Sequence, residues 1–195
     1  MEVDKKETYK KILKVAQDLI IQKPYHSVSL NMIARGAGVS KPSLYYYFKN
    51  KEDLFLKIFE EVSQEFDQEL SKVLEKDLEC LEKLHFFIET YINFFFVKKN
   101  LIRILLQRIC KEDKNLFFKI RETREGIVSK LEIIMTEVLK KEGRGGDLSP
   151  RLASMMVLGM LGTFYVEYIE EEKKIELSPG QAADQIFSFL GFKIN

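Results

Sequence analysis

The stretch SLNMIARGAGVSKPSLYYYFKNKEDL, residues 29–54, decides the fold of this chain. Its first half spaces apolar residues as one face of a short helix, which Ser29 can cap. Gly38 ends that helix, because only glycine takes a positive φ without a steric penalty. A second short helix begins after Ser40, with Pro42 in its first turn, where the missing N–H costs nothing. The stretch therefore predicts two short helices joined by a glycine turn.

The second short helix is expected to expose an unusual mixture of side chains. Leu44 and Phe48 supply its buried face, which leaves cations, hydroxyls and aromatic rings outside. Two short helices of this kind fit a helix-turn-helix whose second helix enters the major groove of DNA. Tyr47 has two readings, as a core residue or as a phosphate contact. The residues expected to point outward are Lys41, Ser43, Tyr45, Tyr46 and Tyr47.

Residues 33–54, IARGAGVSKPSLYYYFKNKEDL, resemble the N-terminal DNA-binding domain of TetR-family transcriptional regulators. The residues that fall in register are Gly38-Val39-Ser40, Leu44-Tyr45, Phe48, Lys51 and Leu54. The resemblance implies an all-α fold, with a three-helix helix-turn-helix DNA-binding domain over residues 1–50. It also implies a C-terminal helical domain for ligand binding and dimerisation over residues 51–195.

The resemblance also implies which residues meet DNA. Ser29 matches a position whose hydroxyl contacts a phosphate, and Lys51 matches a phosphate contact at the start of a helix. Asn31 matches a position from which some members reach a base edge, with an ordinary exposed polar helix residue as the alternative interpretation. The expected DNA-binding residues are Ser29, Asn31, Ser40, Lys41, Pro42, Ser43, Tyr45, Tyr46, Tyr47 and Lys51.

Charge is distributed unevenly along the chain. Residues 1–58 hold 11 Lys or Arg against 6 Asp or Glu, whereas the remaining residues hold 20 against 24. The basic end is therefore the end with the helix-turn-helix, as phosphate binding requires. A first helix is expected over residues 5–23. It ends at Pro24, where the family usually has glycine, so the turn geometry there must differ.

The rest of the chain shows helical periodicity with no competing strand alternation. The expected helices cover residues 51–75, 78–97, 101–111, 115–141, 148–169 and a last segment from 178 to about 191.

Aromatic residues are abundant in this C-terminal part. They can form ordinary core, or part of them can line a cavity between helices that holds an apolar ligand. Family members generally respond to an effector in this domain, and the apolar bias predicts a hydrophobic or amphipathic small molecule. Arg121 can instead pair with Glu125 at i,i+4. The expected effector-binding residues are Tyr91, Phe95, Arg103, Arg121 and Tyr165.

Small residues near the C-terminus allow another backbone to approach closely. Ala153, Gly159 and Gly162 fit either a subunit interface or a tight contact within the chain. By resemblance, the last two helices form a four-helix bundle with a second copy. Such a homodimer would bind a pseudo-palindromic double-stranded DNA operator, and we expect a repressor that an effector releases by a population shift.

Other classes of function find little support. Cys80 and Cys110 are too few for a disulfide framework, and with His26 and His85 they show no metal-ligand spacing, so no metal or cofactor is expected. The cysteines are expected to be buried free thiols, with a redox sensor as the alternative. No nucleophile elbow or phosphate loop suggests an enzyme. An all-helical interaction module that does not bind DNA is the remaining rival.

The start of the chain suggests where the protein works. Met1 leads into charged residues with no apolar signal-peptide segment, and the apolar runs are too short to span a bilayer. We therefore expect a soluble cytoplasmic protein without a membrane partner.

Overall fold

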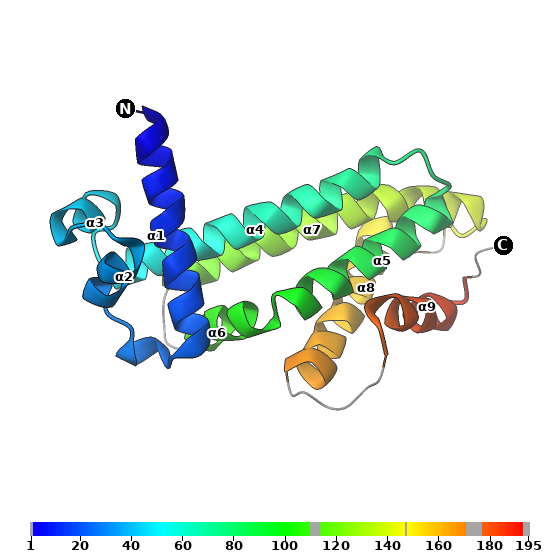
Figure 1. Cartoon of the computed structure of the whole chain (residues 1–195). Coiled ribbons are helices and arrows are strands. Elements are labelled where there is room, and N and C mark those ends of the chain that lie inside the picture. The colour runs from blue at the N-terminus through cyan, green and yellow to red at the C-terminus, as the bar shows by residue number, and fades with distance from the viewer. Residues whose placement is uncertain (1, 110–113, 147, 171–176, 193–195) are drawn as a thin grey trace. The chain divides into compact units, whose positions relative to one another are not determined.

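The computed structural model describes residues 2–109, 114–146, 148–170 and 177–192. Within these residues the secondary structure is helical, with no strand, which confirms the all-α prediction (Figure 1). None of the described helices is both long and apolar enough to cross a membrane. The elements are α1 (Glu2–Gln22), η1 (Tyr25–Ser27), α2 (Leu30–Ala37), α3 (Lys41–Tyr47), α4 (Lys51–Glu75), α5 (Cys80–Val97), α6 (Lys99–Ile109), α7 (Lys114–Lys141), α8 (Pro150–Phe164), η2 (Tyr165–Glu170) and α9 (Pro179–Phe189).

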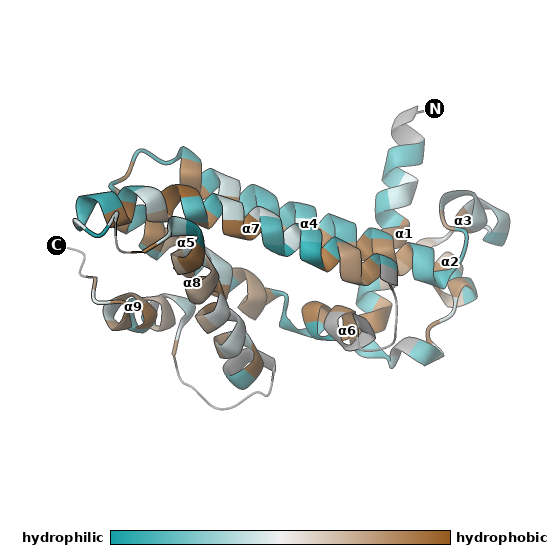
Figure 2. Ribbon diagram, turned by 180° about the vertical axis from the view of Figure 1, so that it is seen from behind, coloured by the Kyte–Doolittle hydropathy of each residue, from teal (hydrophilic) through white to brown (hydrophobic). Residues whose placement is uncertain are grey.

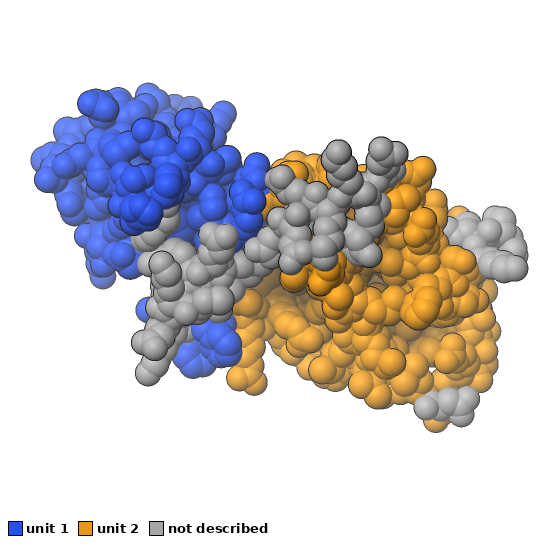
Figure 3. Space-filling view, turned by 90° about the horizontal axis from the view of Figure 1, so that it is seen from below, with its two compact units in different colours: residues 1–63, 100–118 blue, residues 64–99, 119–195 orange. Residues whose placement is uncertain are grey.

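The chain forms two compact units, which are coloured separately in Figure 3. Unit 1 comprises Met1–Ser63 and Asn100–Phe118, and unit 2 comprises Gln64–Lys99 and Lys119–Asn195. Helices α4 and α7 each run from one unit into the other. The domain boundary after residue 50, at the start of α4, stays a prediction.

Unit 1 is built on the apolar faces of α1, α2, α3 and the first half of α4. Figure 2 shows hydrophilic and hydrophobic residues interleaved along α4, as expected for a helix with one buried face. Fully burying a large aliphatic or aromatic side chain contributes about 1.5–3 kcal/mol, so this small core can hold two short helices together. Its most deeply buried residues include Ile12, Leu13, Ala16, Ile33, Ala37, Leu44, Phe48, Leu54 and Ile58.

Unit 2 is organised around α5, which packs against α8, η2 and above all α9. Because α5 is apolar nearly all round, it needs covering on several sides. One polar contact joins it to α9: His85 Nε2 lies 2.7 Å from Asp184 Oδ1. Cys80, in the first turn of α5, is a buried free thiol, whereas Cys110 lies outside the described residues.

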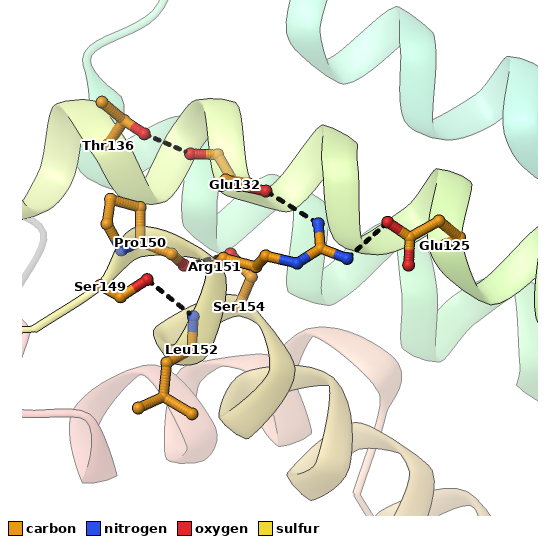
Figure 4. Close-up of polar contacts among 8 residues, drawn as sticks. All are labelled: Glu125, Glu132, Thr136, Ser149, Pro150, Arg151, Leu152 and Ser154. Atoms are coloured by element: carbon orange, nitrogen blue, oxygen red, sulfur yellow. Dashed lines mark hydrogen bonds and ion pairs between the residues drawn. The ribbon is translucent and has the colours of Figure 1, made fainter.

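The start of α8 is fastened to α7 (Figure 4). Ser149 caps α8 by accepting a hydrogen bond from the Leu152 N–H at 3.5 Å. Arg151, in the first turn, donates to Glu125 at 2.5 Å and to Glu132 at 3.2 Å. The two carboxylates lie two turns apart on α7 and therefore face the same side of that helix.

The last part of the chain differs in one detail from the expected single helix over residues 148–169. The α-helical pattern ends at Phe164, and η2 continues as a wider π-helix. Just before this change, Thr163 Oγ1 donates to the Gly159 carbonyl at 3.1 Å, a contact that bends helices. Periodicity alone cannot show such a local widening, because a π-helix of six residues is too short to establish a spacing of its own.

Candidate nucleic-acid interface and ligand site

Two serine caps and one glycine set the geometry of α2 and α3. Ser29 Oγ accepts from the Met32 N–H at 3.2 Å, which satisfies a free donor in the first turn of α2. Gly38 has a φ of 64° and ends α2 in the left-handed conformation. Ser40 Oγ then accepts from the Ser43 N–H at 3.2 Å to begin α3. The local sequence therefore forms the helix-turn-helix that it predicts.

The two capping serines can each make a second hydrogen bond. Ser29 and Ser40 are exposed, and a hydroxyl that accepts a backbone N–H bond can still donate its own proton. Pro42 is also exposed, in the first turn of α3. The geometry thus leaves two hydroxyl donors directed at solvent near the turn, where a phosphate oxygen could accept them.

The outer side of α3 carries the aromatic and cationic residues. Tyr46 is 69% exposed and Tyr45 is 46% exposed. Lys41 is exposed as well, and its Nζ lies 5.9 Å from the centre of the Tyr45 ring. Ser43 is half-buried beside them. One short helix therefore presents a cation, rings and hydroxyls together, a surface suited to base edges and phosphates.

Tyr47 lies differently from its two tyrosine neighbours. It is half-buried, and its hydroxyl donates to the backbone carbonyl of Lys5 at 3.2 Å. Its ring lies 6.0 Å from that of Tyr9, also on α1. The tyrosine therefore joins α3 to α1, a contact that neither of its two sequence readings included.

The start of α4 also lies in unit 1. Asn50 Oδ1 accepts from the Asp53 N–H at 2.7 Å, and Asp53 Oδ2 accepts from the Lys49 N–H at 2.9 Å. Lys51 is half-buried at this capped helix start, where backbone N–H groups favour an anion. Asn31 is exposed in the first turn of α2. All ten residues predicted to bind DNA lie in unit 1.

An aromatic cluster occupies the interior of unit 2. Tyr91 and Phe95 stack with ring centres 4.6 Å apart, and Tyr165 of η2 meets Phe95 at 5.0 Å. Phe66 of α4 extends the cluster, because its ring lies 5.4 Å from Tyr91 and 4.5 Å from Phe94. The fold thus brings together three residues predicted to bind an effector and adds two more.

Both tyrosines of this cluster are buried, with 6% of Tyr91 and 3% of Tyr165 exposed. Burial raises the pKa of the Tyr91 phenol, the nearby Tyr165 raises it further, and Arg124 opposes them. The phenol therefore stays neutral at physiological pH and offers a hydrogen bond within apolar surroundings.

The two arginines predicted to bind an effector lie on other helices than the residues of this cluster. Arg103 lies on α6 in unit 1, half-buried, with Nη2 3.4 Å from Asn100 Oδ1. Arg121 is exposed on α7 in unit 2. Glu125, its suggested i,i+4 partner, bonds Arg151 of α8 instead.

Phe66 is the cluster residue that sequence reasoning missed, because it was visible only as a member of an apolar helix face, which most often forms plain core. Phe94 belonged to the aromatic residues that could line a cavity, but it was not among those chosen as effector-binding. A helical pattern says which residues share a face, but not which other helix meets that face. Among the described residues, no group of three or more His, Cys, Asp or Glu is placed to hold a metal ion.

Comparison with known proteins gives one consistent result. Residues 12–58 match the family described as bacterial regulatory proteins, tetR family. The chain is 27% identical over 173 residues, 89% of each chain, to the fatty acid metabolism regulator protein of Bacillus subtilis (strain 168). The crystal structure of FadR from Bacillus subtilis in complex with stearoyl-CoA is similar with a TM-score of 0.76 at 25% identity, covering 93% of this chain and 97% of that one. The fatty acid degradation regulator FadR from Bacillus halodurans has the same fold, with a TM-score of 0.77 at 24% identity over 94% of both chains.

Proposed function

This chain belongs to the TetR family of transcriptional regulators, and we propose that it is a homodimeric repressor released from its operator by a long-chain acyl-CoA. The observation that carries the effector class is the buried aromatic cluster around Tyr91, Phe95 and Tyr165. A protein that this chain resembles along most of its length is named a fatty acid metabolism regulator protein. Because its target is DNA, we place the protein in the cytoplasm.

The DNA-binding side rests on α3. Lys41 and Lys51 supply the charge for phosphates, and the exposed rings and hydroxyls of Tyr45 and Tyr46 reach into the major groove. The excess of positive charge over residues 1–58 supports this placement. The proposed interface consists of Ser29, Asn31, Ser40, Lys41, Pro42, Ser43, Tyr45, Tyr46 and Lys51. Tyr47, predicted from the sequence to join them, instead supports α3 through its hydrogen bond to α1.

A second copy of the chain is proposed to cover the outer face of α8. Leu152, Met155 and Met156 are 49%, 40% and 58% exposed, an unusual concentration of apolar surface on one helix. A Cβ added at Gly159 or Gly162 would meet no atom of the described chain within 4 Å. The two glycines therefore do not serve a close contact within the described part of the subunit, which favours their use between subunits.

The effector is proposed to be an acyl thioester because the cluster in unit 2 is apolar with few polar handles. An acyl chain would lie against Phe66, Tyr91 and Phe95. Arg121 and Arg124 of α7 would contribute positive charge for the anionic part of the molecule. Arg103 of unit 1 stays a sequence prediction.

Release from DNA depends on the effector having different affinities for two conformations of the protein. The effector binds better to a form in which the two recognition helices no longer match their half-site spacing, and so shifts the population away from DNA. Helices α4 and α7 are the candidates for transmission, because each runs unbroken from one unit into the other.

The test begins with selection of duplexes from a random-sequence pool, which yields the operator and shows whether it has dyad symmetry. Operator affinity is then measured by fluorescence anisotropy with stearoyl-CoA, free CoA or stearate. We expect stearoyl-CoA to weaken binding about 5–150-fold, the usual range of allosteric coupling, and free CoA to leave it unchanged. An unchanged affinity in stearoyl-CoA refutes the effector, and failure to select any duplex refutes the DNA-binding role.

A matched pair of variants locates the effector. Phe95 is half-buried within the cluster, whereas its neighbour Phe96 is 50% exposed. Phe95→Leu should reduce the response to stearoyl-CoA, and Phe96→Leu should keep it. Equal responses in the two variants would place the ligand away from the cluster.

A further inference from the structure

The first turns of α1 reach the recognition helix α3. The ammonium Nζ of Lys5 lies 3.5 Å from the Tyr46 hydroxyl and 5.5 Å from the centre of the Tyr46 ring. Tyr46 is also 69% exposed, so it stands on the outermost side of α3. The Lys5 ammonium of α1 thus lies beside an exposed side chain of α3, the helix proposed to bind DNA.

A series of rings leads from the core of unit 1 to that position. Phe48, which is fully buried, stacks on Tyr9 with ring centres 5.4 Å apart. Tyr9 meets Tyr47 at 6.0 Å, and Tyr47 meets Tyr46 edge-on at 5.1 Å. Edge-to-face and stacked ring pairs stabilise an arrangement beyond the effect of their buried area. The position of Tyr46 relative to α1 is therefore fixed by packing.

A hydrogen bond fixes the backbone of the same turn. The Tyr47 hydroxyl donates to the Lys5 carbonyl at 3.2 Å. A helical carbonyl has two lone pairs, so it can accept this bond together with its own helix bond. Tyr47 thus holds the backbone of Lys5, while Tyr46 meets its side chain.

From this arrangement we infer that Lys5 is a further DNA-contacting residue, which neutralises a backbone phosphate at the edge of the major groove that α3 enters. Tyr47 acts as its positioning residue. Lys5 is exposed, and the contact described for its ammonium is with the uncharged Tyr46 side chain, so its charge remains available to a phosphodiester. A lysine ammonium that meets a phosphate supplies charge without reading bases. The inference rests on the DNA-binding role proposed above.

The salt dependence of operator binding tests this contact. Each neutralised phosphate contributes about 0.9 to the slope of log affinity against log salt concentration. Lys5→Gln should therefore lower the slope by about 0.9 for each subunit in contact with DNA, with the preferred sequence unchanged. Lys14→Gln is the matched control, because nine residues at about 100° each place Lys14 on the opposite face of α1. It should keep the wild-type slope.

The outcomes separate the two proposals. If the wild type binds duplex DNA with a steep salt slope and Lys5→Gln leaves that slope unchanged, only the role of Lys5 is refuted. A wild-type protein without a steep slope overturns the DNA-binding proposal itself. Far-UV circular dichroism and thermal melting of each variant distinguish loss of a contact from loss of the fold.

The positioning role of Tyr47 needs a readout that a purely structural residue would not move. Tyr47→Phe removes only the hydroxyl that holds the Lys5 carbonyl. In the Tyr47→Phe background, Lys5→Gln should change the salt slope less than it does in the wild type, because coupled residues are not additive. Equal changes in the two backgrounds would show that Tyr47 does not position Lys5.

Discussion

Arg151 of α8 donates to Glu125 of α7, with Nη2 2.5 Å from Oε1 (Figure 4). A cation in the first turn of a helix faces the positive end of the helix dipole, so it needs negative partners to stay there. Hydrogen bonding to Glu125, and then to Glu132, raises the pKa of the Arg151 guanidinium. The start of α8 is therefore held to α7 by one guanidinium that two carboxylates of α7 share.

Arg151→Gln should lower the melting temperature of the protein in dilute buffer, because Glu125 and Glu132 lose a shared partner. The pair is solvent-accessible, so salt should screen the effect, and the difference from wild type should shrink in about 1 M salt. Calorimetry at the two salt concentrations measures it. Arg121→Gln on α7 is the control. An equal loss from both variants would mean that net charge, and not the contact to α7, decides the effect.

Gly38→Ala should destabilise the protein by about 1–2 kcal/mol, because a φ of 64° is costly for any residue with a Cβ. Space is not the cause, since the nearest atom to an added Cβ would be Lys11 Nζ at 3.6 Å. Gly143→Ala shares the strain, with a φ of 68° at the end of α7. Urea unfolding should give similar losses for both variants. Only Gly38→Ala should also weaken operator binding by native protein, and an undiminished stability for it would contradict the turn.

The buried Tyr91 phenol should make stability fall at alkaline pH. Its pKa in the folded protein is raised above the ordinary value of 10.0, chiefly by burial. Below pH 10.0 both states keep the proton, but above it the unfolded chain releases the proton while the folded chain retains it. The free energy of unfolding should then decrease by up to about 1.4 kcal/mol per pH unit from this group. Urea unfolding between pH 8 and 11 measures the decline.

Tyr91→Phe should flatten that alkaline decline while keeping the ring that stacks on Phe95. Tyr45→Phe removes an exposed phenol and leaves Tyr91 in place, so it should retain the contribution of Tyr91 to the decline. Identical pH profiles for Tyr91→Phe and the wild type would show that the phenol is not buried as described.

Met156→Glu should convert the proposed dimer to a monomer, because it places a charge within the apolar surface of α8, where Met156 is 58% exposed. Sedimentation velocity reports the mass directly. Gln68→Glu, at an exposed position of α4, adds the same charge elsewhere and should leave the dimer intact. A Met156→Glu protein that remains dimeric would place the interface on another surface.

Local features of the site could be predicted because their causes are local. Ser29, Gly38 and Ser40 act on backbone groups within a few residues, so sequence spacing alone is enough to identify the caps and the turn. The buried faces of α2 and α3, with Ile33, Leu44 and Phe48, follow from helical period in the same way.

The contacts between distant segments depend on packing that no local pattern encodes. The Tyr47 hydroxyl meets a carbonyl 42 residues away, and Arg151 meets Glu125 26 residues away. Glu125 had seemed a partner for Arg121, because the i,i+4 rule considers only one helix.

The sequence by itself determined the helical class, the helix-turn-helix and the family, since these depend on short-range spacing of residue types. Only the tertiary structure decided that Phe66 joins Tyr91 in one cluster and that Lys5 meets Tyr46. The physical reason is that an apolar helix face can be buried by many different partners. Close packing of all neighbouring side chains together selects one of them, and that packing exists only in the folded structure.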